Sequence, residues 1–323
     1  MIFSTINAQE ISKFQPYGKP VVIIFADYTA GLGKANNISG FNLTRARLGY
    51  EYQATSSLSA KIVIDIEEGL KRSAFFHFAM LEWKHNNLTI GGGLVGLQQF
   101  DLQEAFWRHR YVEQSFQNLT KMGNSTDLGI VAKYKFADWI NGDLSITNGE
   151  GTRSINTNNS NKYGLGITIR PVKNLTFRAY TDIYTDSENL RAPIAAGETA
   201  SFDNQKTIAT FIGYQHDKFS IGAEYNNQVN KSFVKGCDYY GYSVYAQVKV
   251  SKEIGLFGRY DYVDAKTSDN LSFDWNFINK DMFITGLEYQ PSKNFRIGPC
   301  YHYAKSLDNN KLHHISLKTE FRL

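Results

Sequence analysis

The feature that most constrains the fold of this chain is an alternation of apolar and polar residues, which recurs in long segments from one end to the other. Residues 58–67 set leucine, alanine and three isoleucines on one face against Lys61, Asp65 and Glu67 on the other. A period of two residues is typical of β-strands with one apolar and one polar face. The pattern predicts sixteen strands, at residues 19–31, 41–54, 58–68, 73–85, 88–97, 126–137, 139–148, 162–171, 174–186, 204–216, 218–228, 237–250, 254–265, 279–290, 293–304 and 311–323.

The connections between these segments alternate in length. Short turns, such as residues 55–57 and Asp138, are followed by longer polar links, such as residues 98–125. All long links then lie at one end, as in an antiparallel meander, and an even number of strands lets the meander close. We therefore predict an all-β fold, a transmembrane antiparallel up-and-down β-barrel of about 16 strands with a long third extracellular loop. Pro299 lies in mid-segment, where a closed barrel has no edge, so we expect a β-bulge there.

Two features favour a membrane barrel over a soluble β-sandwich. The predicted strands commonly have ten or more residues, whereas strands of globular proteins centre near about 5–6 residues and about 9–11 tilted residues span a bilayer. Charged side chains also lie in mid-strand on the second face, which suits a lumen filled with water and lipid against the apolar face. Tyr, Phe and Trp gather near the segment ends, as in the aromatic girdles of such barrels.

Sixteen strands enclose a lumen too wide for strand side chains to fill, so we expect an aqueous channel. The charged residues on the polar face have both signs, which suits a hydrophilic diffusion pore. For any single one of them, the alternative is a solvated wall residue without a binding role. The predicted pore-lining residues are Arg45, Arg47, Glu51, Lys61, Asp65, Lys133, Arg178, Arg259 and Asp261.

The third long connection, residues 98–125, is the longest and contains a stretch that permits a helix. Ordered loops of this length usually have a function. An inward fold would narrow the lumen and direct charged residues into the permeation path. The alternative is an external cap whose aromatic residues Phe106, Trp107 and Phe116 pack on the rim. We favour the inward fold, in which the constriction residues are Glu104, Arg108, His109 and Arg110.

The segment Thr44–Glu51, with the sequence T-R-A-R-L-G-Y-E, resembles a strand near the start of phosphate-selective porins of the porin O and P type. Gln99–Glu104 and Asp127–Gly129 are also similar to segments of such porins. The resemblance implies a 16-stranded bacterial outer-membrane channel, often a homotrimer, that passes small anions or general solutes. The constrictions of this family are rich in lysine, whereas residues 98–125 offer two arginines, one histidine and two glutamates before residue 117. We therefore expect mild anion preference.

Other chemistry finds little support in the sequence. Gly91–Gly96 matches G-x-G-x-x-G but lies in a predicted strand without a βαβ unit, so close backbone packing explains it better than a nucleotide site. Cys237 and Cys300 lie in distant segments, and the seven histidines are scattered. We expect no enzyme activity, no catalytic residues, no cofactor and no metal. The net charge of only +4 argues against a nucleic-acid partner.

Residues 1–9 resemble the tail of a secretory signal peptide that has lost its basic start, and the alternative is a disordered N-terminus. We expect residues 10–323 to form one barrel domain in the bacterial outer membrane.

The predicted function is that of a porin, a channel for passive diffusion of small hydrophilic solutes with mild anion preference. The expected partners are outer-membrane lipid and lipopolysaccharide, small hydrophilic solutes or anions, and two further copies of the chain in a homotrimer. The alternative is a barrel without a channel, acting as an adhesin or as a subunit of an envelope assembly.

Overall fold

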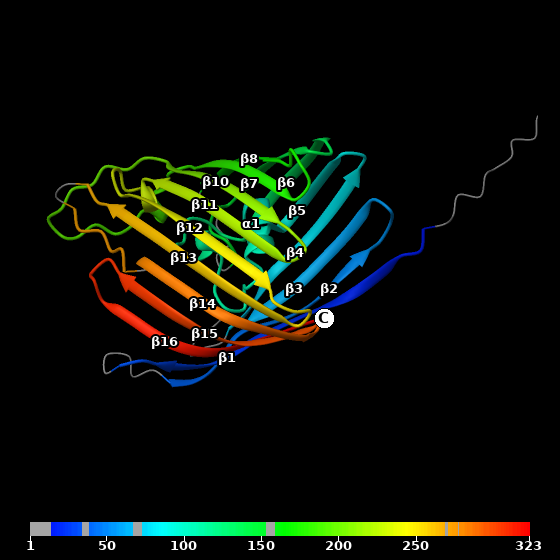
Figure 1. The fold of residues 1–323 in the computed structure, drawn as a ribbon. Coiled ribbons are helices and arrows are strands. Elements are labelled where there is room, and N and C mark those ends of the chain that lie inside the picture. The colour runs from blue at the N-terminus through cyan, green and yellow to red at the C-terminus, as the bar shows by residue number, and fades with distance from the viewer. Residues whose placement is uncertain (1–13, 34–38, 67–72, 153–158, 269–270, 277) are drawn as a thin grey trace, which may run out of the picture.

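The computed structural model describes residues 14–33, 39–66, 73–152, 159–268, 271–276 and 278–323, and these form a β-barrel (Figure 1). Its strands are β1 (Tyr17–Gly31), β2 (Ser39–Gln53), β3 (Leu58–Ile66), β4 (Ala74–His85), β5 (Leu88–Gly96), β6 (Thr126–Ala137), β7 (Ile140–Thr147), β8 (Lys162–Ile169), β9 (Leu175–Tyr184), β10 (Gln205–Gln215), β11 (Phe219–Val229), β12 (Asp238–Lys249), β13 (Ile254–Lys266), β14 (Asn279–Ser292), β15 (Phe295–Ser306) and β16 (Lys311–Arg322).

Each strand pairs in antiparallel fashion with its neighbours in the sequence, and β1 pairs with β16 to close the sheet. The closing register runs from Ile23 opposite Arg322 to Gly31 opposite His314. Closure gives every strand two partners, so no strand edge is left to be exposed in a membrane. The structure confirms the prediction of an all-β, up-and-down barrel of sixteen strands.

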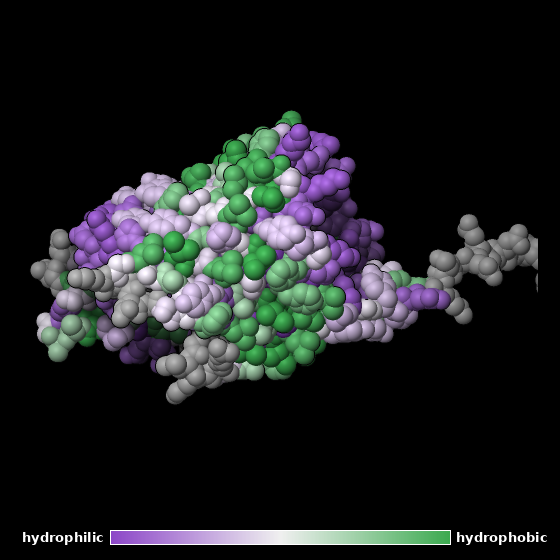
Figure 2. Space-filling model, turned by 60° about the horizontal axis from the view of Figure 1, so that its bottom comes forward, coloured by the Kyte–Doolittle hydropathy of each residue, from purple (hydrophilic) through white to green (hydrophobic). Residues whose placement is uncertain are grey.

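The outer surface is apolar across its middle. Figure 2 shows a broad band of hydrophobic residues with hydrophilic residues on both sides of it. Outward side chains such as Phe41 and Leu48 have exposed fractions of 86% and 67%. An exposed apolar surface far larger than a few hundred Å² marks a membrane or protein contact. No helix in the described part of the chain is both long and apolar enough to cross a membrane.

Two β-bulges occur in the wall formed by the first four strands. Phe25 pairs with Arg45 and Ala26 with Leu43, which leaves Thr44 as an extra residue in β2. In the same way His77 is an extra residue in β4, because Val63 pairs with Phe78 and Ile64 with Phe76. A bulge re-aims the side chains beside it, and both bulges border the constriction described below.

The bulge expected at Pro299 is absent. Gly286 pairs with Cys300 and Tyr289 with Ile297, so the register between β14 and β15 does not change across the proline. The register shifts of this pair lie near its two ends, between Asn279 and Asp281 and between Tyr289 and Ser292. A proline removes one ladder hydrogen bond without requiring an inserted residue, so the strand keeps its register.

The third long connection contains α1 (Gln98–Trp107) and α2 (Phe116–Leu119) and lies inside the barrel (Figure 1). This confirms the inward fold predicted from the sequence. The structure also has two short 3₁₀ segments in other connections, η1 (Glu188–Leu190) and η2 (Lys231–Phe233).

Candidate permeation pathway

Apolar side chains hold the third loop against one part of the barrel wall. Phe106 packs edge-on against Phe211 of β10, with ring centroids 4.9 Å apart, and Trp107 packs on Tyr245 of β12 at 5.6 Å. Gly213 gives the Phe106 ring its space, because a Cβ atom there would lie 2.4 Å from the ring. Aromatic pairs of this geometry contribute about 0.5–1.5 kcal/mol each beyond area burial. The loop therefore fills the part of the lumen that these strands border.

Two buried arginines of the wall bind the same loop. Arg178 of β9 donates to Oε1 of Gln99 at 2.8 Å and to both carboxylate oxygens of Asp143, at 2.7 and 2.9 Å. Arg259 of β13 donates to the carbonyl oxygen of Gln114 at 2.5 Å and to both oxygens of Asp261, at 2.8 and 2.6 Å. Charge-assisted, bidentate pairs of this kind also fix geometry.

This arrangement changes the interpretation of three residues that we expected to line the pore. Arg178, Arg259 and Asp261 do point inward, but their exposed fractions are 3%, 2% and 3%. The loop covers them, so in this structure they anchor it instead of bordering open water. Alternation in a strand shows which face a side chain takes, and it contains no information on what covers that face.

The loop residues Arg108 and His109 lie on the covered side of the lumen. His109 is 3% exposed, packs 4.2 Å from the Phe257 ring, and has Nε2 3.3 Å from Oε2 of Glu288. Arg108 lines cavities bordered by the turn ends of β8–β14. The structure therefore does not bring these two residues together with Arg45 and Arg47. The backbone at Arg108, which caps the C-terminus of α1, is in the left-handed conformation with φ of 59°.

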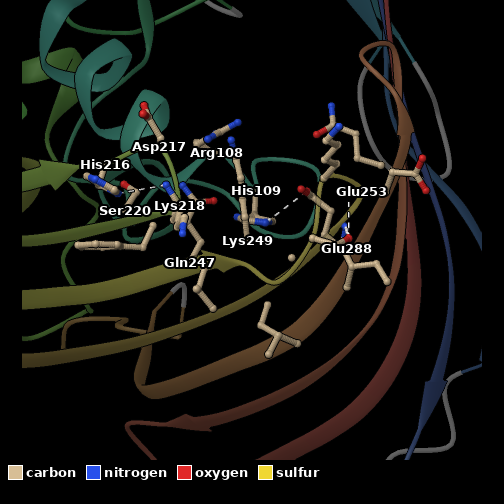
Figure 3. Close-up of a pocket in the computed structure, with 18 residues that line it drawn as sticks. Arg108, His109, His216, Asp217, Lys218, Ser220, Gln247, Lys249, Glu253 and Glu288 are labelled. Atoms are coloured by element: carbon tan, nitrogen blue, oxygen red, sulfur yellow. Dashed lines mark hydrogen bonds and ion pairs between the residues drawn. The ribbon is translucent and has the colours of Figure 1, made fainter.

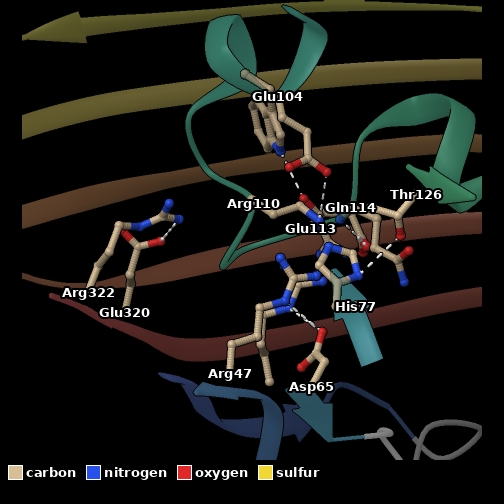
Figure 4. Close-up of polar contacts among 12 residues, drawn as sticks. Arg47, Asp65, His77, Glu104, Arg110, Glu113, Gln114, Thr126, Glu320 and Arg322 are labelled. Carbon is tan, nitrogen blue, oxygen red and sulfur yellow. Dashed lines mark hydrogen bonds and ion pairs between the residues drawn. The ribbon is translucent and has the colours of Figure 1, made fainter. Parts of the chain in front are cut away.

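Glu104 and Arg110 of the loop face the opposite, open part of the lumen, toward β2–β4 (Figure 4). Arg110 Nε lies 3.2 Å from Oε1 of Glu104. Arg47 Nε donates to Oδ2 of Asp65 at 2.7 Å, and Arg45 Nε lies 3.6 Å from the same oxygen. Three guanidinium groups and two carboxylates thus border the passage between loop and wall.

A cavity lies on each side of this passage. The first, of about 310 Å³, is lined by Arg45, Arg47, Arg110 and Lys318, by the carboxylates Asp65 and Glu113, and by both bulge residues. The second, of about 450 Å³, opens toward the turn end and contains Glu51, Lys61, Lys133 and Asp101. In it, Lys61 and Lys19 both bind Glu51, at 2.8 and 2.9 Å.

Asp101 and His77 border this pathway and were not among the predicted site residues. Asp101 is exposed to the cavity, and partial loss of hydration beside the surrounding protein raises the pKa of its carboxyl to about 6. No pattern in the sequence shows that a residue in the first turn of α1 will face the lumen. His77 is inward because of the bulge in β4, which alternation alone does not predict.

The model of the family described as beta-barrel porin-2, OmpL-like, matches residues 119–312. The chain belongs to this porin family. A comparison with curated proteins found no match to the sequence. The porin therefore lies in the bacterial outer membrane and forms a channel there, and the closed barrel with cavities on both sides of its inward loop is the structure of that channel.

Solved structures of other barrels are similar to this porin over nearly the whole chain. OmpF of Salmonella typhi, in complex with daunomycin, has a TM-score of 0.70 at 12% identity and covers 95% of this chain and 97% of its own. The anion-selective porin from Comamonas acidovorans has a TM-score of 0.69 at 11% identity, with 96% and 100% covered. OmpT of Vibrio cholerae has a TM-score of 0.65 at 15% identity, with 98% and 100% covered. At sequence identities this low, the TM-scores show that these proteins share the fold of the barrel.

Proposed function

We propose that this porin passes small hydrophilic solutes passively and prefers anions mildly. The observation that supports the preference is the composition of the passage, where four cations face three carboxylates. The cations are Arg45, Arg47, Arg110 and Lys318, and the carboxylates are Asp65, Glu104 and Glu113. Fixed arginines in a narrow pore favour anions, and their field extends over about 8 Å at physiological salt. The excess of a single positive charge explains why the preference is mild.

Arg45 is the residue that we propose as the main source of this field. Arg47 and Arg110 each hold a carboxylate oxygen at 2.7 and 3.2 Å, whereas Arg45 is 3.6 Å from a carboxylate that Arg47 already occupies. Its guanidinium instead lies 5.2 Å above the Phe25 ring. Arg45 is therefore the least neutralised cation of the passage.

The likeness of Thr44–Glu51 to phosphate-selective porins supports anion passage, and we extend it no further than that. Two of the three arginines are engaged by carboxylates of the protein itself. A dianion would have to displace these partners, so we propose preference for anions as a class over strict phosphate specificity.

Changing Arg45 and Arg47 together to Glu tests the proposal. The zero-current potential in a salt gradient should move toward cation preference, most strongly at low salt, because screening weakens the field as salt rises. The matched control is Lys135→Glu, a charge reversal in an exposed ion pair with Asp138 near a turn. An inserted double variant with the parent's potential at low salt would overturn the assignment.

We further propose a homotrimer surrounded by outer-membrane lipid and lipopolysaccharide. The similarity to OmpT of Vibrio cholerae in its trimer form, with a TM-score of 0.64, and the apolar band on the outer wall support this assembly. The mass of the protein in mild detergent tests it. We retain one barrel domain over residues 10–323 and a passive role without catalysis. The proposed signal remnant, residues 1–9, lies outside the described residues.

A further inference from the structure

The turn end of the barrel holds a third cavity, which shares no described lining residue with the two cavities of the permeation pathway. It has a volume of about 640 Å³ and lies between the covered side of α1 and the ends of β8–β12. Phe106, which packs on Phe211, forms part of its wall. A volume between about 300 and 1,000 Å³ is typical of small-molecule sites, so this cavity is of a size to hold a solute.

The rim of the cavity is strongly basic. Arg108 comes from the loop, Arg170 and Lys173 from the connection between β8 and β9, and Lys249 from the end of β12, against a single carboxylate, that of Asp217. Arg108, His216, Asp217 and Lys249 also line the adjoining cavity drawn in Figure 3, which Glu253 and Glu288 border as well. These cations differ from most others inside the barrel, such as Lys61, which bind carboxylates.

Among the described residues, the side chains of Arg108, Arg170, Lys173 and Lys249 form no ion pair with any carboxylate. Arg108 is half-buried, and burial together with the nearby Arg296 lowers its pKa. A bound anion would relieve both effects, since a nearby opposite charge favours the charged form. The backbone at Arg108 is left-handed, which is disfavoured for residues with a side chain. This conformation places the guanidinium on the covered side, away from Arg110.

Part of the lining of the same cavity is apolar. Leu102, Ala105 and Phe106 of α1 form one side and Leu175 of β9 another. An inorganic ion would leave this surface in contact with water, whereas an organic anion with an apolar body would cover it and reach the rim cations with its acidic groups.

We propose that this cavity is a binding site for small organic polyanions, separate from the constriction and open to the turn end of the barrel. None of the described residues that line it lines the cavities beside Arg45 and Arg47, so the solute would be held apart from the passage. The residues of this site differ from those proposed to set the anion preference of the passage, so one proposal can fail while the other holds.

Benzene-1,3,5-tricarboxylate is a suitable probe, titrated calorimetrically into the full, detergent-purified protein at low salt. We expect binding that Arg108→Gln with Lys249→Gln weakens by about tenfold or more. The control, Lys84→Gln with Lys293→Gln, removes the same charge from other turns and should leave affinity within about twofold. The exposed pair Arg170→Gln with Lys173→Gln gives a second test that does not depend on the folding of the first variant.

Three results would overturn the proposal. In the first, the parent protein fails to bind the tricarboxylate. In the second, the control variant weakens binding as much as the cavity variants do, which would indicate attraction by the overall surface charge. In the third, Arg45→Gln with Arg47→Gln abolishes binding while the cavity variants bind normally, which would place the anion in the constriction.

Discussion

Arg47 and Asp65, on the neighbouring strands β2 and β3, are joined by a hydrogen bond of 2.7 Å, and Arg45 lies 3.6 Å from the same carboxylate. Two cations of the passage therefore share one anion. The pair Arg110 and Glu104 faces them from the loop. The sign and strength of the electric field in the passage depend on how the arginines share this carboxylate, and the expected ion selectivity depends on that field.

Removing the shared carboxylate should strengthen the preference for anions. In Asp65→Asn, the carboxylate that lies 2.7 Å from Arg47 and 3.6 Å from Arg45 is lost, so the zero-current potential should move further toward anions at low salt. Asp138→Asn, which removes an exposed carboxylate at a turn, is the control. A shift toward cations in Asp65→Asn would show that these arginines do not set the potential.

Breaking the buried ion pair beneath the loop should lower stability. Arg178→Gln leaves Asp143 without its bidentate partner and Gln99 without its donor. Loss of one member of a buried pair costs about 3–5 kcal/mol. The temperature at which the barrel unfolds, followed by circular dichroism, should therefore fall, whereas Lys135→Gln in an exposed pair should leave it unchanged. Equal transition temperatures in Arg178→Gln and the parent would argue against an anchoring role.

Deleting residues 104–117 should raise the single-channel conductance, because the loop fills part of the lumen and narrows the rest. The deletion also uncovers apolar wall residues such as Phe211 and Phe257. Folding should be checked by circular dichroism before conductance is compared. A correctly folded deletion variant with the parent's conductance would mean that the loop does not limit the current.

Acid should increase anion preference through Asp101. Its pKa is raised to about 6, so the carboxyl is charged at about pH 7 and largely neutral at about pH 5. The cavity on the turn side then loses one negative charge, and the zero-current potential should move toward anions. Asp101→Asn should show the acidic potential at both pH values. If the variant keeps the pH dependence of the parent, another group is responsible.

The strands and the closed barrel could be predicted because alternation is local and repeats in every segment. Thus Ile62 and Ile64 of β3 point outward while Lys61 and Asp65 point inward, as their order in the sequence requires. Closure followed from the regular lengths of the connections. These features depend on residues close in sequence.

The filling of the lumen could not be predicted in the same way. Arg45 and Arg178 have the same inward orientation, yet one borders a cavity and the other lies beneath the loop. Arg108 and Arg110 are two residues apart in the loop, and a left-handed residue sends them to different sides. Both outcomes depend on packing between segments far apart in the chain.

The most direct test of a water-filled channel with a net positive passage is the current through the purified protein in a planar bilayer. With potassium chloride, whose two ions have similar mobility, the account predicts stepwise increases in conductance and a zero-current potential of the sign for mild chloride preference. A bilayer that contains folded protein but shows no conductance steps, or a potential of the sign for potassium preference, would contradict it.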